Sequence, residues 1–214
     1  MSARLGELRA PGHGDQPLSP AGLLLAAGAG RRMGRPKALV VVRGRPLLVG
    51  ALAALRDGGC APLVVVLGAE AEAAAELVPP DVRVVVARAW ADGMGASLRA
   101  GLAALEPLAC PAALVHLVDL PGVGPAAITR LAAAEGPEVL ARAAYHGVPG
   151  HPVLLGRSHW PGVRAAATGD AGARGYLAGH PALRLIECGD VADPGDVDTP
   201  ESLRALTDPP TEPT

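Results

Sequence analysis

The sequence predicts an α/β fold in which a doubly wound, mostly parallel sheet carries helices on both faces. Short apolar runs alternate with alanine-rich stretches, half of the residues are hydrophobic, and only 2% are aromatic. Alternating strands and helices favour right-handed crossovers between parallel strands. A core of Leu, Val and Ala, in a chain without Phe, suits helices packed on such a sheet.

The first half of the chain shows the expected alternation most clearly. Its strands are short and apolar throughout, as buried parallel strands are. The first long helix has Pro46 near its start and Gly58-Gly59 after its end, which are common helix boundaries. The expected strands are 22–27, 63–67 and 82–86, the helices are 46–56, 70–77 and 97–105, and residues 38–43 are expected to be extended.

In the second half the rhythm changes after residue 143. Residues 147–152 (GVPGHP) are dense in turn formers, and we expect them to begin a small lobe or lid over the carboxyl edge of the sheet. The expected strands are 112–118, 139–143, 153–155 and 183–188, and the expected helices are 125–134, 172–178 and 200–206.

Length and composition indicate one domain, which we place at residues 21–206. Residues 1–20 lack the apolar core of a signal peptide and are expected to be a disordered leader, and residues 207–214 a disordered tail. No run of about 18 apolar residues suggests a membrane span, and a net charge of −2 gives no bulk attraction to nucleic acid or membranes. We therefore expect a cytoplasmic protein with three free thiols, at Cys60, Cys110 and Cys188.

The first strand runs into a glycine-rich, cationic loop, which is typical of a phosphate site. Three glycines (Gly28, Gly30 and Gly34) let backbone N–H groups approach an anion, and nearby cations neutralise it. The spacing differs from the dinucleotide fingerprint, whose third glycine comes one residue earlier. It also differs from the P-loop, because Ala38 stands where a hydroxyl should follow Lys37.

This loop, LAAGxGxRMGxxK from Leu25 to Lys37, resembles the signature loop of the MobA-like nucleotidyltransferases. Its Ala-Ala-Gly variant resembles the cytidylyltransferases that act on molybdenum cofactor. The resemblance extends to residues 93–98 (GMGASL), which in the family line the nucleobase pocket. It implies a nucleotide site made of Leu25, Ala26, Ala27, Gly28, Gly30, Gly34, Gly95 and Ser97.

Asp119 ends the fourth strand at the same sheet edge as the loop. A carboxylate beside a triphosphate repels it unless a cation bridges the two, and Mg²⁺ prefers one or two carboxylates with phosphate oxygens. The Asp-x-Pro at this point is similar to the metal site of the family. The segment DVDTPE from Asp196 resembles the family's second metal contact. Asp198 or Thr199 can cap the next helix; we favour Asp196 as the metal ligand and Asp198 as the cap.

Two later motifs resemble the acceptor side of the family. They imply acceptor-binding roles for His151, Asp170 and Arg174. His116, three residues before Asp119, is expected to be a core residue or to support the site. A structural role remains the alternative for each of these residues, because a lone His or Arg is more often structural.

The resemblance implies transfer of a nucleoside monophosphate, with CMP from CTP favoured, to a small phosphorylated acceptor such as molybdopterin cofactor. Pyrophosphate is released with Mg²⁺, and Arg32, Lys37 and Asp119 are the implied catalytic residues. One alternative is an NAD(P)H-dependent oxidoreductase resembling nicotine blue oxidoreductase, for which Glu70 would be the ribose-binding acid. The other is a non-catalytic cofactor chaperone, against which the presence of both Lys37 and Asp119 argues.

Overall fold

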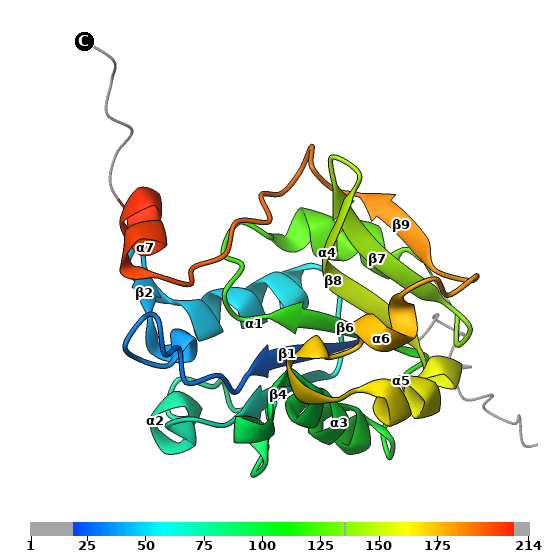
Figure 1. Cartoon of the computed structure of the whole chain (residues 1–214), viewed down its shortest axis with the longest axis horizontal. Helices are drawn as coiled ribbons and strands as arrows, with labels where there is room; N and C mark the ends of the chain where they lie inside the picture. Colours follow the sequence, from blue (N-terminus) through cyan, green and yellow to red (C-terminus); the bar gives the residue numbers. More distant parts are fainter. Residues whose placement is uncertain (1–18, 135, 208–214) are drawn as a thin grey trace, which may run out of the picture.

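The computed structural model describes residues 19–134 and 136–207. Within these residues one seven-stranded sheet organises the fold (Figure 1). Strand β8 runs antiparallel to both of its neighbours, and every other pair is parallel. The strand order is β5 (Arg83–Val86), β4 (Leu63–Leu67), β1 (Ala21–Ala26), β6 (Ala112–Leu117), β8 (Val148–Gly156), β7 (Leu140–Tyr145) and β9 (Arg184–Glu187). The predicted mostly parallel α/β fold is therefore confirmed.

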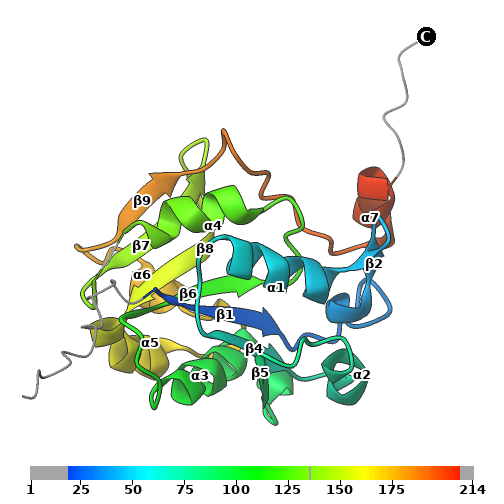
Figure 2. The ribbon, with the colours of Figure 1, turned by 180° about the vertical axis from the view of Figure 1, so that it is seen from behind.

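Helices cover both faces of the sheet, as the two opposite views show (Figures 1 and 2). Side chains alternate between the faces along each strand, so Leu24 packs in one core while Leu23 and Leu25 pack in the other. One core includes α1 (Leu47–Asp57) and α4 (Pro125–Ala132), and the other includes α3 (Met94–Leu105), α5 (Trp160–Ala166) and α6 (Arg174–Leu177).

Most of the short elements lie at the carboxyl edge of the central strands, whereas η3 (Arg157–His159) lies beside the start of β6. The segment expected to be extended at 38–43 instead contains a 3₁₀ turn, η1 (Lys37–Leu39), and the short strand β2 (Val41–Val42), which pairs with β3 (Arg45–Pro46). The remaining elements are α2 (Ala71–Ala75), η2 (Trp90–Asp92), η3 (Arg157–His159), η4 (Gly169–Ala171) and α7 (Pro200–Thr207). Thr207 is thus helical rather than part of a tail, and the other residues of the expected leader and tail, except 19 and 20, lie outside the described residues.

The largest departure from expectation concerns residues 147–152. They do not begin a separate lobe; residues 148–152 belong to the long strand β8, which forms a hairpin with β7. His146 and Gly147 make the turn, with φ of 54° and 80°. Two successive positive φ angles are the geometry of the tight hairpin turn that matches the twist of the flanking strands. The 3₁₀ turn and helix at Arg157–Ala166 were also not expected.

Two further expectations can be compared with the structure. Cys60, Cys110 and Cys188 are buried, and none of them forms a disulfide. In the part of the chain that the structure describes, no helix has the length and apolar character needed to cross a membrane.

His116 is a core residue of the central strand β6, where it pairs with Leu24 of β1. Its side chain is fully buried, and neither ring nitrogen has a hydrogen-bond partner among the described residues. Burial, with a smaller contribution from nearby His151, lowers the pKa of His116 from 6.5 to about 3. The folded protein therefore holds this imidazole in its neutral form.

This burial makes stability depend on pH. Because the folded pKa lies below the unfolded value, the contribution of His116 is fully present above pH 6.5 and is lost as the pH falls towards 3. One extra proton bound by the unfolded chain corresponds to about 1.4 kcal/mol of unfolding free energy per pH unit. The measurement is the unfolding free energy from urea titrations at several pH values between 6 and 4. We expect the dependence of this free energy on pH to be weaker in His116→Leu than in the wild type, by about one proton. The same pH dependence in both proteins would contradict the assignment.

Candidate active site

The loop after β1 exposes a row of backbone donors. The carbonyl of Gly30 accepts the N–H groups of Met33 and Gly34, each at 2.9 Å, which closes the loop into a tight turn. Gly30 has φ of 58°, and a Cβ there would lie 2.0 Å from the carbonyl oxygen of Arg35. Among the described residues, the N–H groups of 28–32 have no acceptor. Such a run of free donors is a natural anion site.

Lys37 forms the centre of an ion-pair cluster beside this loop. Its Nζ donates to Oδ2 of Asp119 at 2.7 Å and lies 2.7 Å from Oδ1 of Asp198. The second oxygen of Asp198 lies 2.5 Å from a terminal nitrogen of Arg32. The side chains of Lys37, Asp119 and Asp198 are only 17%, 18% and 16% exposed. Three segments distant in sequence therefore meet at one charged point.

Two members of the cluster, Lys37 and Asp198, are held in their charged forms. Burial alone lowers the pKa of Lys37, but hydrogen bonds and charge from Asp119 and Asp198 outweigh it and raise this pKa above 10.5. The hydrogen bond from Lys37, supported by the charges of Lys37 and Arg32, lowers the pKa of Asp198. One ammonium thus holds two carboxylates close together and stabilises the ionised form of Asp198.

Backbone contacts place the two aspartates. Asp119 follows β6, and its carbonyl accepts the N–H of Val197 at 2.9 Å, which fixes the segment before α7 against the sheet. The expected cap role of Asp198 is wrong: Oγ1 of Thr199 accepts the N–H of Ser202 at 3.2 Å. The carboxylate of Asp198 is therefore available to Lys37.

A cavity of about 390 Å³, here called the loop cavity, lies between the phosphate-type loop and α3. Most of the residues expected to bind nucleotide line it. Gly34 and Gly95 do not: the N–H of Gly34 is used within the loop, and a Cβ at Gly95 would lie 2.8 Å from the carbonyl carbon of Ala167, so this glycine serves close packing. The expected residues in its wall are Leu25, Ala26, Ala27, Gly28, Gly30, Arg32, Lys37, Ser97, Asp119 and Asp198.

Sequence reasoning missed one large side chain of the loop cavity. Trp90, on η2, contributes to its wall together with Met94, which starts α3 and lies within the expected stretch 93–98. Gly68 leaves room for the indole, because a Cβ there would lie 2.6 Å from Cγ of Trp90. A tryptophan four residues after an edge strand, in a chain with two tryptophans, could have pointed to this position.

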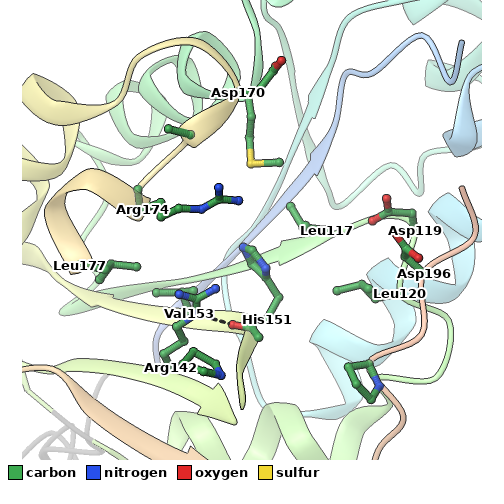
Figure 3. Close-up of a pocket in the computed structure, with 16 residues that line it drawn as sticks. Leu117, Asp119, Leu120, Arg142, His151, Val153, Asp170, Arg174, Leu177 and Asp196 are labelled. Carbon is green, nitrogen blue, oxygen red and sulfur yellow. Dashed lines mark hydrogen bonds between the residues drawn. The ribbon is translucent and has the colours of Figure 1, made fainter. Parts of the chain in front are cut away.

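A second cavity of about 310 Å³, here called the hairpin cavity, lies between the β7–β8 hairpin and α6 (Figure 3). All three residues predicted for the acceptor side, His151, Asp170 and Arg174, line it. Asp196 lines it as well, so the two aspartates before α7 face different cavities. Sequence reasoning missed Arg142, although a single charge within the apolar strand LARAAY was visible.

The two cavities are neighbours that share one wall. Met94, Leu117, Asp119 and Asp170 line both of them. Asp119 and its partner Lys37 therefore lie where the contents of the two cavities would meet. This arrangement suits the joining of two ligands, or the binding of one ligand with two halves.

The cluster also suits a divalent cation. Within residues 19–134 and 136–207, no three His, Cys, Asp or Glu side chains form a metal-binding group. Mg²⁺, however, needs only one or two carboxylates when phosphate oxygens complete its shell, and Asp119 and Asp198 converge on one point. The donor set therefore fits a magnesium ion that arrives with a nucleotide.

Two characterised proteins are similar to this chain over most of its length. The chain is 42% identical to nicotine blue oxidoreductase of Paenarthrobacter nicotinovorans over 197 residues, covering 86% of this chain and 95% of the relative. It is 31% identical to a molybdenum cofactor guanylyltransferase of Rhodobacter capsulatus over 193 residues, covering 88% and 90%.

Solved structures are similar to the fold of this chain over most of its length. Rv0371c of Mycobacterium tuberculosis superposes with a TM-score of 0.77 at 28% identity, covering 90% of this chain and 99% of that one. A structure of the same protein in complex with manganese gives a TM-score of 0.71 at 27% identity, covering 88% and 98%. The model of the MobA-like NTP transferase domain matches residues 22–184. The chain therefore belongs to the MobA-like NTP transferase family, as its signature loop predicted.

Proposed function

We propose that this protein transfers a nucleoside monophosphate from a nucleoside triphosphate to a small phosphorylated acceptor such as molybdopterin cofactor. The observation that carries the proposal is the Lys37–Asp119–Asp198 cluster at the junction of two cavities. Nucleotidyl transfer depends mainly on positioning and charge stabilisation. The two neighbouring cavities suit the positioning of two ligands, and the charged side chains between them suit charge stabilisation.

The loop cavity takes the nucleotide in this proposal. The free N–H groups of 28–32 hold the β- and γ-phosphates. An ammonium has three donors, and Lys37 uses two of them on aspartates, which leaves the third for a phosphate oxygen. Arg32, exposed beside the same loop, neutralises charge that develops on the leaving pyrophosphate.

The hairpin cavity takes the acceptor. An ionised phosphate oxygen of the acceptor attacks the α-phosphorus, the bond from that phosphorus to the β-phosphate oxygen breaks, and pyrophosphate leaves. No general base is needed, because the attacking phosphate is already ionised. The chain's contribution is to hold the two ligands on either side of Asp119, at the shared wall.

Asp119 and Asp198 are the residues we assign to Mg²⁺, because both carboxylates meet at Lys37, while Asp196 faces the hairpin cavity. When bound, the ion would neutralise phosphate charge beside the α-phosphorus. The manganese complex of the mycobacterial relative supports a divalent cation in this fold.

CTP remains the favoured nucleotide because of the pair Ala26-Ala27. The relative from Rhodobacter capsulatus is named a guanylyltransferase, so GTP is the main competitor. The second candidate function is an NAD(P)H-dependent oxidoreductase, favoured by 42% identity to nicotine blue oxidoreductase. Glu70, the acid considered for the ribose, does not line the loop cavity.

A thermal-shift panel separates these candidates. We expect CTP with Mg²⁺ to raise the melting temperature most, because a ligand that binds the folded state stabilises it. GTP, ATP and NADH, each with and without Mg²⁺, complete the panel. A magnesium-independent shift with NADH alone would replace the transferase with the oxidoreductase. A CTP shift without pyrophosphate release, across phosphorylated acceptors, would indicate a chaperone.

Lys37→Ala tests the cluster. We expect it to remove roughly 2–4 kcal/mol of transition-state stabilisation, as loss of a preorganised charge donor does, and so to lower turnover about 30- to 1,000-fold. Arg35→Ala is the matched control, since Arg35 is exposed in the same loop and lines neither cavity. The measurement is the rate of pyrophosphate release. A near-wild-type rate in Lys37→Ala would contradict the catalytic role of Lys37.

A pair of isosteric variants tests the metal ligands. We expect Asp198→Asn to weaken Mn²⁺ binding by about tenfold or more, measured by electron paramagnetic resonance with and without CTP. Asp196→Asn, two residues away, should have a smaller effect, because its side chain faces the other cavity. If Asp196→Asn weakened Mn²⁺ binding more than Asp198→Asn does, Asp196 would be the ligand instead.

A further inference from the structure

The two carboxylates assigned to Mg²⁺ form ion pairs with cations of the chain itself. One oxygen of Asp198 lies 2.7 Å from the ammonium of Lys37, and the other lies 2.5 Å from a terminal nitrogen of Arg32. Oδ2 of Asp119 lies 2.7 Å from the same ammonium. Of these four carboxylate oxygens, only Oδ1 of Asp119 has no ion-pair partner in the part of the chain that the structure describes. A divalent cation that binds both carboxylates therefore competes with a cationic side chain.

The backbone keeps the two carboxylates close together, which makes this competition direct. The carbonyl of Asp119 accepts the N–H of Val197 at 2.9 Å, and the side chain of Val197 is fully buried. The N–H of Asp198 donates to Oγ of Ser202 at 3.0 Å. The ammonium of Lys37 lies at the position where both carboxylates converge. A metal ion bound there, about 2.0–2.1 Å from each oxygen in the case of Mg²⁺, takes the place of the ammonium.

Charge balance also opposes a metal ion that arrives alone. The two cationic and two carboxylate side chains of the cluster carry no net formal charge, so Mg²⁺ by itself would add uncompensated positive charge to a poorly exposed place. Within residues 19–134 and 136–207, no third His, Cys, Asp or Glu completes a metal-binding group. A nucleoside triphosphate changes both conditions. Its phosphate oxygens can accept the two cationic side chains and can complete the shell of the metal.

We propose that the cations Lys37 and Arg32 keep a divalent cation away from the two carboxylates until the phosphates of a nucleotide draw them off. Arg32 is free to move, because its side chain is 75% exposed, and Lys37 has a third donor that can take a phosphate oxygen. Metal and nucleotide then bind with positive coupling, in which each raises the affinity for the other by the same factor. This inference rests on the proposed function and adds a control over when the metal binds.

The test is binding of Mn²⁺ alone to the full chain, measured by electron paramagnetic resonance without nucleotide. We expect Lys37→Met to bind Mn²⁺ at least about tenfold more tightly than the wild type, because the two carboxylates then lack their shared counter-ion. Arg35→Met is the matched control, because Arg35 is exposed in the same loop and forms no ion pair with either aspartate. Mn²⁺ affinity in Lys37→Met that is equal to or lower than in Arg35→Met would overturn the proposal.

A second substitution shows where the additional Mn²⁺ affinity arises. Adding Asp198→Asn to Lys37→Met should remove most of the gain, because the metal then loses one of its two carboxylates. A gain that survives this substitution would place the ion elsewhere and overturn the proposal. If Lys37→Met does not fold, Arg32→Met replaces it, since Arg32 is exposed and its loss frees one oxygen of Asp198. Arg32→Met should strengthen Mn²⁺ binding in the same direction but less, and unchanged binding would overturn the proposal.

The inference and the proposed function fail in different ways. If Lys37→Met gains Mn²⁺ affinity but the wild-type protein releases no pyrophosphate with any nucleotide, the counter-ion role stands and the transferase falls. If the wild-type protein releases pyrophosphate with Mg²⁺ but Lys37→Met gains no Mn²⁺ affinity, the transferase stands and the counter-ion role falls.

Discussion

The site depends on one interaction: the ammonium of Lys37 held between the carboxylates of Asp119 and Asp198, at 2.7 Å from each. Two ionised carboxylates in a mostly buried place repel one another unless a cation lies between them. Lys37 supplies that cation and so joins the β1 loop, the end of β6 and the segment before α7. The backbone bond from Val197 to Asp119 supports the same junction without charge.

This junction divides the ligand space into two parts with different chemistry. On one side, the loop cavity offers free backbone donors beside Arg32 and Lys37, which suit a polyphosphate. On the other, the hairpin cavity offers Arg142 and Arg174 in a wall that also carries His151, three aspartates and several apolar side chains. A reaction that joins a nucleotide to a phosphorylated molecule needs both kinds of space, side by side, with charge control at their border.

The parts of the site that the sequence predicted are those set by local pattern. The apolar run LVVVL forms β4 over the same residues as expected. Lys37 and Asp119 were expected at the same sheet edge because each follows a parallel strand, and they form an ion pair there. The parts it missed depend on which segments pair and on which of two similar side chains makes a contact. Residues 147–152 resembled a lid because Gly and Pro favour turns, yet pairing with β7 makes 148–152 part of a bulged strand. The sequence offered both Asp198 and Thr199 as the cap of α7, and the structure shows that Thr199 makes the cap contact and leaves Asp198 free.

The geometry of this chain is compatible with the kinds of ligand that the names of its two relatives imply, a nucleotide to be transferred and a redox dinucleotide. A nucleotidyl transfer to a phosphate monoester produces two groups joined by a diphosphate, and a nicotinamide dinucleotide has that same general shape. Two cavities that meet at a cationic border therefore suit either molecule. What separates the two functions is whether a phosphorus–oxygen bond must break. Bond cleavage requires stabilisation of the charge on the leaving pyrophosphate. The row of free N–H groups in the loop, with Lys37 and Arg32 beside it, is suited to stabilise that charge. Hydride transfer leaves the diphosphate unchanged and has no such requirement.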